Sequence, residues 1–308
     1  MDGGDKPKKR GESLTAYATL VRLPNLFTAP PDPILGAAFS IGVGYTVSTG
    51  AVVGLAAASV LLYAAGTTLN DYFDAVEDAR ERPERPIPTG AVSRERAFVF
   101  GVALLGSGVM LALVTAGTLA GVVAGGLALV IVLYDGVFKG SVVGFLFMGG
   151  SRGLNVFLGT TAAVSFPVLS PQIFVVIAIV LFYIAAVTYM AESETKGNNR
   201  NAVLVAIASM GVAALGVVGF VVVRSPPLFE TILTATLLIG FFGWTGRALS
   251  RAYTDPVPET IGPAVGTCVL GLVVLNAAFA ATIGVAWALS ILVFLVPAIS
   301  LARMFDIT

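Results

Sequence analysis

The chain has 308 residues, of which 56% are hydrophobic and only 12% charged; its mean hydropathy is +0.91 and its formal net charge is zero. A soluble domain of this length needs far more charge to cover its surface, so the composition excludes an ordinary soluble protein. The neutral balance also argues against a nucleic-acid partner. The chain lacks histidine and has one cysteine, Cys268. This excludes histidine-based metal sites, Ser-His and Cys-His nucleophiles, and an internal disulfide.

The N-terminal residues 1–25 are polar and include a basic run at residues 6–10. We interpret them as a cytosolic tail, and residues 26–305 as a single transmembrane domain. A membrane-spanning helix needs about 20 apolar residues. The last two apolar stretches form either two helices that separate near Gly284 or one helix with a re-entrant piece. We therefore expect an all-α, polytopic transmembrane bundle of nine to ten helices. The ten apolar stretches run roughly over 27–47, 52–70, 97–116, 118–134, 142–164, 171–191, 202–223, 228–246, 264–284 and 286–304.

The charges predict an orientation in the cell membrane. If the stretches alternate in direction, every longer polar loop lies on one side. All of the 18 lysines and arginines except Arg152 and Arg224 then lie on that side, which the positive-inside rule identifies as cytosolic. Both termini are therefore predicted to be cytosolic. The 35 glycines indicate helices that pack closely, as small residues allow in membranes.

Four oxygen-bearing side chains follow the second apolar stretch: Asn70, Asp71, Asp74 and Asp78. If the helix continues through them, their spacing places them on nearly the same face. Carboxylates four residues apart on a helix repel each other, so the arrangement favours a bound cation. Magnesium is suited, because it usually takes one or two carboxylates together with phosphate oxygens. The alternative is a solvated, acidic helix end.

The stretch 80–90 that comes next contains three prolines, which predict an extended, non-helical path. Arg80, Arg82 and Arg85 on such a loop can contact an anionic ligand, because guanidinium groups suit phosphate. Taken singly, each arginine is explained somewhat better by positive-inside topology. The same two interpretations hold for Lys139, which follows the fourth stretch.

Two later features carry weaker or different signals. Glu192 and Glu194 follow the sixth stretch but lie two residues apart, so on a helix they point in different directions. Arg152 lies inside an apolar stretch, where a charge costs at least about 2.5 kcal/mol. We expect Arg152 to be the only deeply placed charge and to have a functional role, with a structural ion pair as the alternative.

At these residues the chain resembles the UbiA superfamily of intramembrane prenyltransferases. The resemblance covers nearly the whole chain. It rests on the element Arg22-Leu23-Pro24-Asn25 and, above all, on Asn70-Asp71-x-x-Asp74-x-x-x-Asp78 followed by Arg85-Pro86-Ile87-Pro88-Thr89-Gly90. It implies a helical bundle around a lipid-accessible cavity, capped by polar loops on the cytosolic side. In this family two acidic loops hold magnesium and an isoprenyl diphosphate, whose allylic C–O bond ionises before an acceptor attacks.

The resemblance implies that the acidic motif forms the first magnesium site, that Lys139 helps to hold the diphosphate and that Asn25 faces the cavity. Aromatic rings near the loops, such as Tyr134, can stabilise an allylic cation. Together these interpretations predict three overlapping groups. The catalytic residues are Asp71, Asp74, Asp78, Lys139 and Arg152. The substrate-binding residues are Arg22, Asn25, Asn70, Arg80, Arg85, Tyr134, Asn155 and Glu194. The metal ligands are Asn70, Asp71, Asp74, Asp78 and Glu194.

The second acidic loop departs from the family pattern. Ala191 and Asn198 stand where acids are usual, and Glu194 stands for one of them, so a second magnesium would be poorly held. This loop, the stretch 151–155 and the C-terminal residues 302–305 resemble a divergent UbiA-like branch. That branch includes members encoded with the Ebo clusters, which have been linked to metabolite export.

Two classes of function follow. The first is magnesium-dependent transfer of an isoprenyl group from an isoprenyl diphosphate to a membrane-soluble acceptor. The second is a UbiA-like carrier, exporter or lipid-binding scaffold with little or no transferase activity. Transporters tend to place ionisable groups near the membrane midplane, whereas these acids gather at the rim, which favours the enzyme. The degenerate second loop favours the carrier, exporter or scaffold. The acceptor, the isoprenyl length and the oligomeric state stay open.

Overall fold

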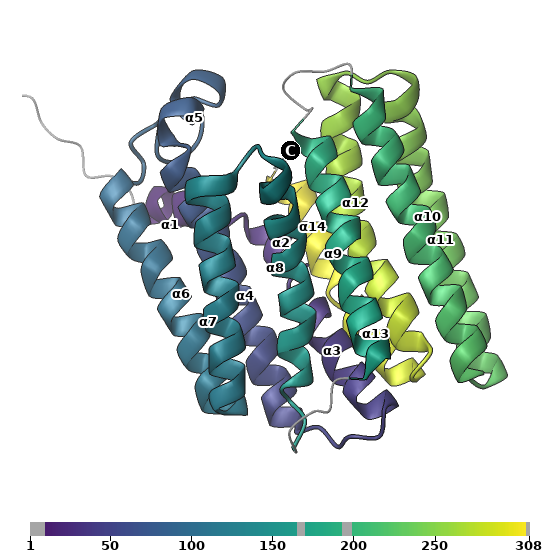
Figure 1. The fold of residues 1–308 in the computed structure, drawn as a ribbon. Helices are drawn as coiled ribbons and strands as arrows, with labels where there is room; N and C mark the ends of the chain where they lie inside the picture. The colour runs from purple at the N-terminus through teal and green to yellow at the C-terminus, as the bar shows by residue number, and fades with distance from the viewer. Residues whose placement is uncertain (1–9, 165–169, 193–198, 306–308) are drawn as a thin grey trace, which may run out of the picture.

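The structure is a computed structural model that describes residues 10–164, 170–192 and 199–305. Its long helices run side by side as one bundle (Figure 1), which confirms the predicted all-helical fold. In the part of the chain that is described, nine helical segments are long and apolar enough to cross a membrane. The helices are α1 (Arg10–Leu20), α2 (Leu23–Leu26), α3 (Pro31–Gly42), α4 (Thr49–Phe73), α5 (Ala75–Glu81), α6 (Arg94–Ala116), α7 (Thr118–Leu133), the π-helix η1 (Tyr134–Phe138), α8 (Val142–Thr160), α9 (Pro171–Ala191), α10 (Arg200–Arg224), α11 (Leu228–Thr254), α12 (Pro258–Ala281), α13 (Val285–Leu292) and α14 (Leu295–Phe305).

The first predicted stretch, 27–47, does not form one spanning helix. The chain instead makes the short helix α2 and the 12-residue helix α3, which begins at Pro31. The reason is local: Pro30, Pro31 and Pro33 each lack a backbone N–H, so they fit the first turn of a helix but not its interior. α3 is too short to cross a bilayer, for which about 20 residues are needed.

The C-terminal stretches divide close to where they were expected to. α12 ends at Ala281 and α13 begins after Gly284. α13 and α14 follow each other and together form the last candidate span, Val285–Arg303. The segment after α12 is therefore long enough to cross, and the separation at Gly284 is confirmed.

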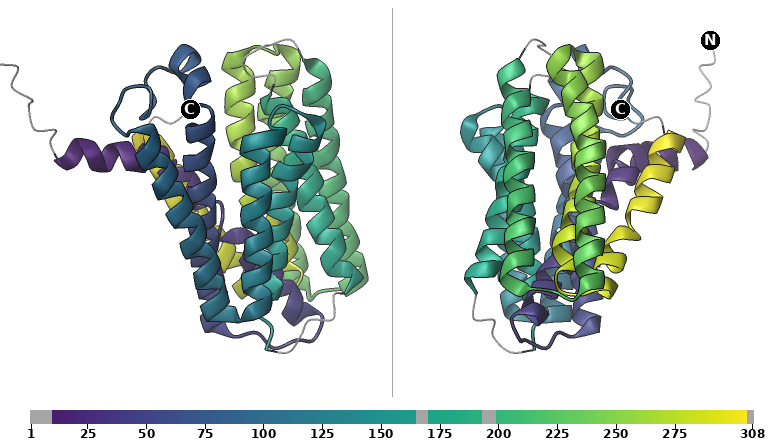
Figure 2. Two further views of the ribbon diagram at one scale, coloured as in Figure 1. Left: turned by 60° about the vertical axis from the view of Figure 1, so that its left-hand side comes forward. Right: turned by 90° about the vertical axis from the view of Figure 1, so that its right-hand side faces the viewer.

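The long polar connections lie at one end of the bundle, which we call the polar end: the end at which α4 finishes and α6 begins (Figure 1). α5, η1 and the start of α8 lie there, as do the end of α9 and the start of α10. α1 lies near this end at a steep angle to the bundle helices, and α14 packs against α2 (Figure 2).

α3 lies at the centre of the bundle and contacts α8 more closely than ordinary side chains would permit. A Cβ atom on Gly36 would lie 1.9 Å from the carbonyl oxygen of Val156, and one on Gly159 would lie 1.9 Å from that of Pro33. Glycine at both positions lets the two backbones touch, as in other membrane helix pairs. By contrast, the outward faces of α10 and α11 expose large apolar side chains such as Leu215 and Ile239, which suits contact with lipid.

Candidate functional site

The acidic motif lies at the polar end, where α4 passes into α5. Asn70 and Asp71 belong to the last turn of α4, Asp74 sits at the junction and Asp78 lies in α5. The backbone N–H of Asp74 donates to the carbonyl of Asn70, and that of Asp78 donates to the carbonyl of Asp74, both at 2.9 Å. The expected helical path through the motif is therefore nearly continuous, with one break at Asp74.

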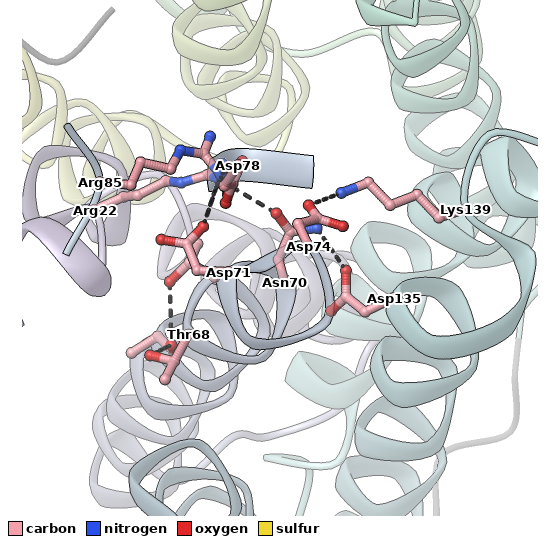
Figure 3. A network of polar contacts seen from close by, with 11 residues as sticks. Arg22, Thr68, Asn70, Asp71, Asp74, Asp78, Arg85, Asp135 and Lys139 are labelled. Atoms are coloured by element: carbon pink, nitrogen blue, oxygen red, sulfur yellow. Dashed lines mark hydrogen bonds and ion pairs between the residues drawn. The ribbon is translucent and has the colours of Figure 1, made fainter. Parts of the chain in front are cut away.

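The first pair of acids is bridged by a loop arginine. Arg85 Nη1 lies 3.1 Å from Asp71 Oδ1 and 2.8 Å from Asp78 Oδ2 (Figure 3). Asp71 and Asp78 are both 4% exposed, so this guanidinium neutralises two buried carboxylates. Arg22 contributes a second cation, its Nη2 lying 3.3 Å from Asp71 Oδ1.

The other two members of the motif contact η1 and the residue directly after it. Asn70 Nδ2 donates to Asp135 Oδ1 at 2.8 Å, and Lys139 Nζ pairs with Asp74 Oδ2 (Figure 3). The four donors therefore do not meet at one point. They form two pairs on either side of the end of α4: the acids pair with Arg22, Arg85 or Lys139, and the Asn70 amide donates to the Asp135 carboxylate.

Arg22 links the two sides through an uncommon backbone conformation. Its φ of 50° lies in the left-handed region, which costs energy for a residue with a side chain and is often found at functional sites. From this position its Nη2 reaches both Asp71 and the amide oxygen of Asn70, the latter at 3.4 Å. Burial lowers the pKa of the Arg22 guanidinium, but the nearby acidic groups, Asp71 first among them, together more than offset this, so its pKa lies above the ordinary value.

The π-helix η1 brings Asp135 and Lys139 to the end of α4. Single π-turns of this kind occur frequently at functional sites. Gly136 permits the approach, since a Cβ atom there would lie 3.2 Å from the ring of Phe73. Gly140 then turns the chain into α8 with a φ of +73°, which glycine adopts readily.

The remaining predicted site residues lie on several different elements. Tyr134 is buried at the start of η1, and Asn25 lies on α2, three residues after Arg22. Arg80 is exposed and belongs to α5, so the predicted non-helical path over 80–90 is wrong for its first two residues, and Arg80 forms no ion pair with any described residue. Glu194, together with Asn198, lies outside the described residues, whereas Glu192 is described and exposed, directly after α9.

Arg152 and Asn155 belong to a separate, deeply buried network. Arg152 Nη1 lies 3.1 Å from Asp32 Oδ2, and its Nη2 donates to the carbonyl of Thr28 at 3.0 Å. Asn155 and Asn276 donate to the two oxygens of Asp32 at 3.1 and 2.8 Å. The expectation that Arg152 would be the only deep charge was therefore wrong, because Asp32 is fully buried beside it.

Sequence reasoning missed two acids that the structure makes prominent. Asp32 stands within an apolar stretch, so the cost of an intramembrane charge that singled out Arg152 applies to it equally. Asp135 lies between Tyr134 and Lys139 in the sequence, and nothing in its own neighbourhood predicts that it faces Asn70. That contact depends on how η1 packs against α4.

The family resemblance implies magnesium at the acidic motif, and the donor set fits it in part. Carboxylate and amide oxygens are the ligands that magnesium takes, usually one or two together with phosphate oxygens and water. Among the described residues, however, no three acidic, histidine or cysteine side chains are grouped closely enough to hold a metal alone. The site is therefore suited to a metal that arrives with a phosphate ligand and not to an all-protein cage.

Comparison with known proteins places the chain among membrane prenyltransferases. Residues 33–201 match the UbiA prenyltransferase family. The digeranylgeranylglyceryl phosphate synthase of Natronomonas pharaonis is 34% identical over 226 residues, which are 65% of this chain and 74% of that protein. The enzyme of the same name from Methanoregula boonei is 44% identical over 85 residues. This match covers only 30% of that relative's length and 26% of this chain.

Two solved structures share the fold. A UbiA homologue from Aeropyrum pernix K1 superposes with a TM-score of 0.65 at 18% identity, covering 82% of this chain and 96% of that one. A UbiA homologue from Archaeoglobus fulgidus bound to GPP and Mg2+ gives a TM-score of 0.56 at 16% identity, covering 86% and 99%. With the family match, the relatives and the helical bundle in agreement, this chain belongs to the UbiA prenyltransferase family.

Proposed function

We propose that the protein transfers an isoprenyl group from an isoprenyl diphosphate to a membrane-soluble acceptor, with magnesium as cofactor. The observation that carries the proposal is the concentration of opposite charges at the polar end: Asp71, Asp74 and Asp78 face Arg22, Arg85 and Lys139. A diphosphate can replace the carboxylates as the partners of the cationic side chains, and a divalent cation can replace the cationic side chains as the partners of the carboxylates. The Archaeoglobus fulgidus homologue, described as bound to GPP and Mg2+, supports this assignment.

In the proposed reaction the allylic C–O bond breaks, and the leaving diphosphate keeps the electron pair. An acceptor lone pair then forms a bond to the allylic carbon, and the acceptor loses a proton. Arg22, Arg85 and Lys139 would lie against the diphosphate and stabilise the charge that builds on it. Magnesium, when bound by Asn70, Asp71, Asp74 and Asp78, would supply further neutralisation of that charge. The surrounding apolar helices would hold the isoprenoid tail and exclude water.

The relatives suggest where to look for the acceptor. Because two of them are named digeranylgeranylglyceryl phosphate synthases, a glycerol phosphate ether is the first acceptor to test. An aromatic acid, a quinone precursor or a tetrapyrrole would be tested next.

The deciding experiment uses purified protein, magnesium and radiolabelled geranylgeranyl diphosphate. Wild-type protein should transfer the label or release pyrophosphate, whereas Asp74→Ala should lose at least 90% of the activity, on the order of the effect of one charged contact. Glu77→Gln, an exposed acid on the neighbouring α5, is the matched control. Equal turnover in wild type and Asp74→Ala would remove the motif from the mechanism.

The proposal includes an orientation. The polar end would face the cytosol with both termini, residues 1–25 would form a cytosolic tail, and residues 26–305 would form the membrane domain. All described arginines and lysines except Arg152 and Arg224 then lie at or near that end, as the positive-inside rule requires.

A second candidate is a UbiA-like carrier or lipid-binding scaffold with little transferase activity, as in the divergent Ebo-associated branch. Ala191 and Asn198 favour it, since they stand where the family usually has acids. Binding of isoprenyl diphosphate without magnesium-dependent release of pyrophosphate would decide for this candidate.

A further inference from the structure

We infer that Asp135 is a positioning residue for the magnesium and diphosphate site: it holds the Asn70 side chain so that the amide oxygen faces the ligand. The inference rests on the proposed function and deepens it. It gives a role to an acid that lies outside the acidic motif and comes from a different helix.

The argument begins with the contact itself. Asn70 Nδ2 lies 2.8 Å from Asp135 Oδ1, and Asp135 is only 8% exposed. A carboxylate accepts hydrogen bonds but does not donate them, so it can bind only the NH2 side of an amide. Asp135 therefore fixes which way the Asn70 amide is turned.

The orientation of the Asn70 amide also determines what its oxygen contacts. With its NH2 group directed at Asp135, Asn70 presents Oδ1 toward Arg22, whose Nη2 lies 3.4 Å away. The same guanidinium contacts Asp71 Oδ1 at 3.3 Å. The amide oxygen of Asn70 thus lies on the side of Asp71, where an oxygen-seeking cation would need it. An amide turned the other way would offer that cation two N–H donors.

The placement of Asp135 is built into the fold. η1 packs against both α4 and α8, and Gly136 allows its backbone to approach the ring of Phe73. Lys139 follows directly after η1 and pairs with Asp74. The π-helix and the residue after it therefore contact both members of the second pair in the motif, Asn70 by an acceptor and Asp74 by a cation.

The test measures binding of geranylgeranyl diphosphate by calorimetry, with magnesium and again with excess chelator. Asp135→Leu removes the acceptor and should weaken magnesium-dependent binding at least tenfold, while binding in chelator, which depends on the arginines and Lys139, stays within twofold. Asp135→Asn keeps an acceptor oxygen in the same shape but adds an NH2 group that can bind the Asn70 oxygen instead, so it should recover only part of the loss. Glu84→Gln, an exposed acid at the same end, controls for net charge, and thermal melts check that each variant is folded.

A double-mutant cycle separates positioning from other roles. If Asp135 acts through Asn70, then Asn70→Ala with Asp135→Leu should bind no more weakly than Asn70→Ala alone. Fully additive losses, or wild-type binding by Asp135→Leu, would overturn this inference while leaving the proposed function intact. A wild-type protein that binds no isoprenyl diphosphate with or without magnesium would overturn both.

Discussion

Arg152 Nη1 lies 3.1 Å from Asp32 Oδ2, and the two side chains are 8% and 0% exposed. They come from α8 and α3, the pair of helices that touch through Gly36 and Gly159. Asn155 and Asn276 complete the hydrogen bonds to Asp32. This buried pair joins α3, α8 and α12 at the centre of the bundle.

Removing one partner of that pair should destabilise the protein strongly. Arg152→Ala leaves the Asp32 carboxylate buried and unpaired, and the expected loss of folding free energy is about 3–5 kcal/mol. Asp32→Ala should cost a similar amount. Thermal unfolding in detergent measures both effects. The double variant Asp32→Ala/Arg152→Ala should lose less than the sum of the single variants, and additive losses would show that the two charges do not depend on each other.

The predicted catalytic role of Arg152 can be separated from this structural one. We expect turnover per folded molecule to fall in Arg152→Lys, which keeps the charge but not the planar guanidinium. A variant with normal turnover per folded molecule would leave Arg152 with the ion pair alone.

Arg85 should govern affinity for the diphosphate. It bridges Asp71 and Asp78 at 3.1 and 2.8 Å, and charged hydrogen bonds of this kind are worth about 1.5–3 kcal/mol each. Arg85→Ala should raise KM for the isoprenyl diphosphate by about 10–100-fold, with a smaller change in kcat. Arg80→Ala, which removes an exposed arginine without an ion pair to the described residues, should change KM less than threefold (about 0.6 kcal/mol at most).

Metal removal should abolish transfer. Release of pyrophosphate is expected to stop when magnesium is chelated and to return on adding it back. Calcium should replace it poorly, because it takes more ligands at longer distances. Unchanged pyrophosphate release in the presence of chelator would contradict a role for the metal.

The contact between α3 and α8 should tolerate no side chain. Gly159→Ala places a methyl group 1.9 Å from the carbonyl oxygen of Pro33, and overpacking of this kind costs at least about 1–3 kcal/mol. Gly125→Ala on α7 meets no atom within 4 Å and should be neutral or stabilising by up to about 1 kcal/mol. Melting temperatures of the two variants in the same detergent provide the comparison.

The orientation is testable by labelling. The natural Cys268 is fully buried and should not react with a membrane-impermeant maleimide. Glu84→Cys at the polar end should react only from the cytosolic side, and Thr46→Cys at the opposite end should react only from the other side. The reverse pattern would show that the polar end faces outward.

The local features of the site were accessible from the sequence. The spacing from Asn70 to Asp78 places the four side chains on nearly one face if the helix continues through them. The backbone bonds at Asp74 and Asp78 show that it nearly does, but the side chains divide into two pairs with different partners. Hydropathy predicted the helices, and alternation predicted that the polar loops share one end. Each of these conclusions depends on residues close together in the chain.

The partners of these residues were not accessible in the same way. Asp32 and Arg152 are 120 positions apart, and Asn276 lies farther still, so only the packing of α3, α8 and α12 brings them together. Asp135 contacts Asn70 because η1 forms a π-helical turn and Gly136 allows this turn to lie close to α4. The break that leaves α3 short was visible as three prolines, but the apolar run around them suggested a full span.

The arrangement of paired charges at the polar end has a thermodynamic consequence. Asp71 and Asp78 share Arg85, and Asp74 has Lys139. A cation that binds alone would take the acids and leave the arginine and the lysine without partners. An anion that binds alone would take the arginine and the lysine and leave the acids without partners. When both enter together, every group exchanges one counter-ion for another. Metal and diphosphate should therefore show positive cooperativity, with the apparent dissociation constant of each falling steeply as the concentration of the other rises.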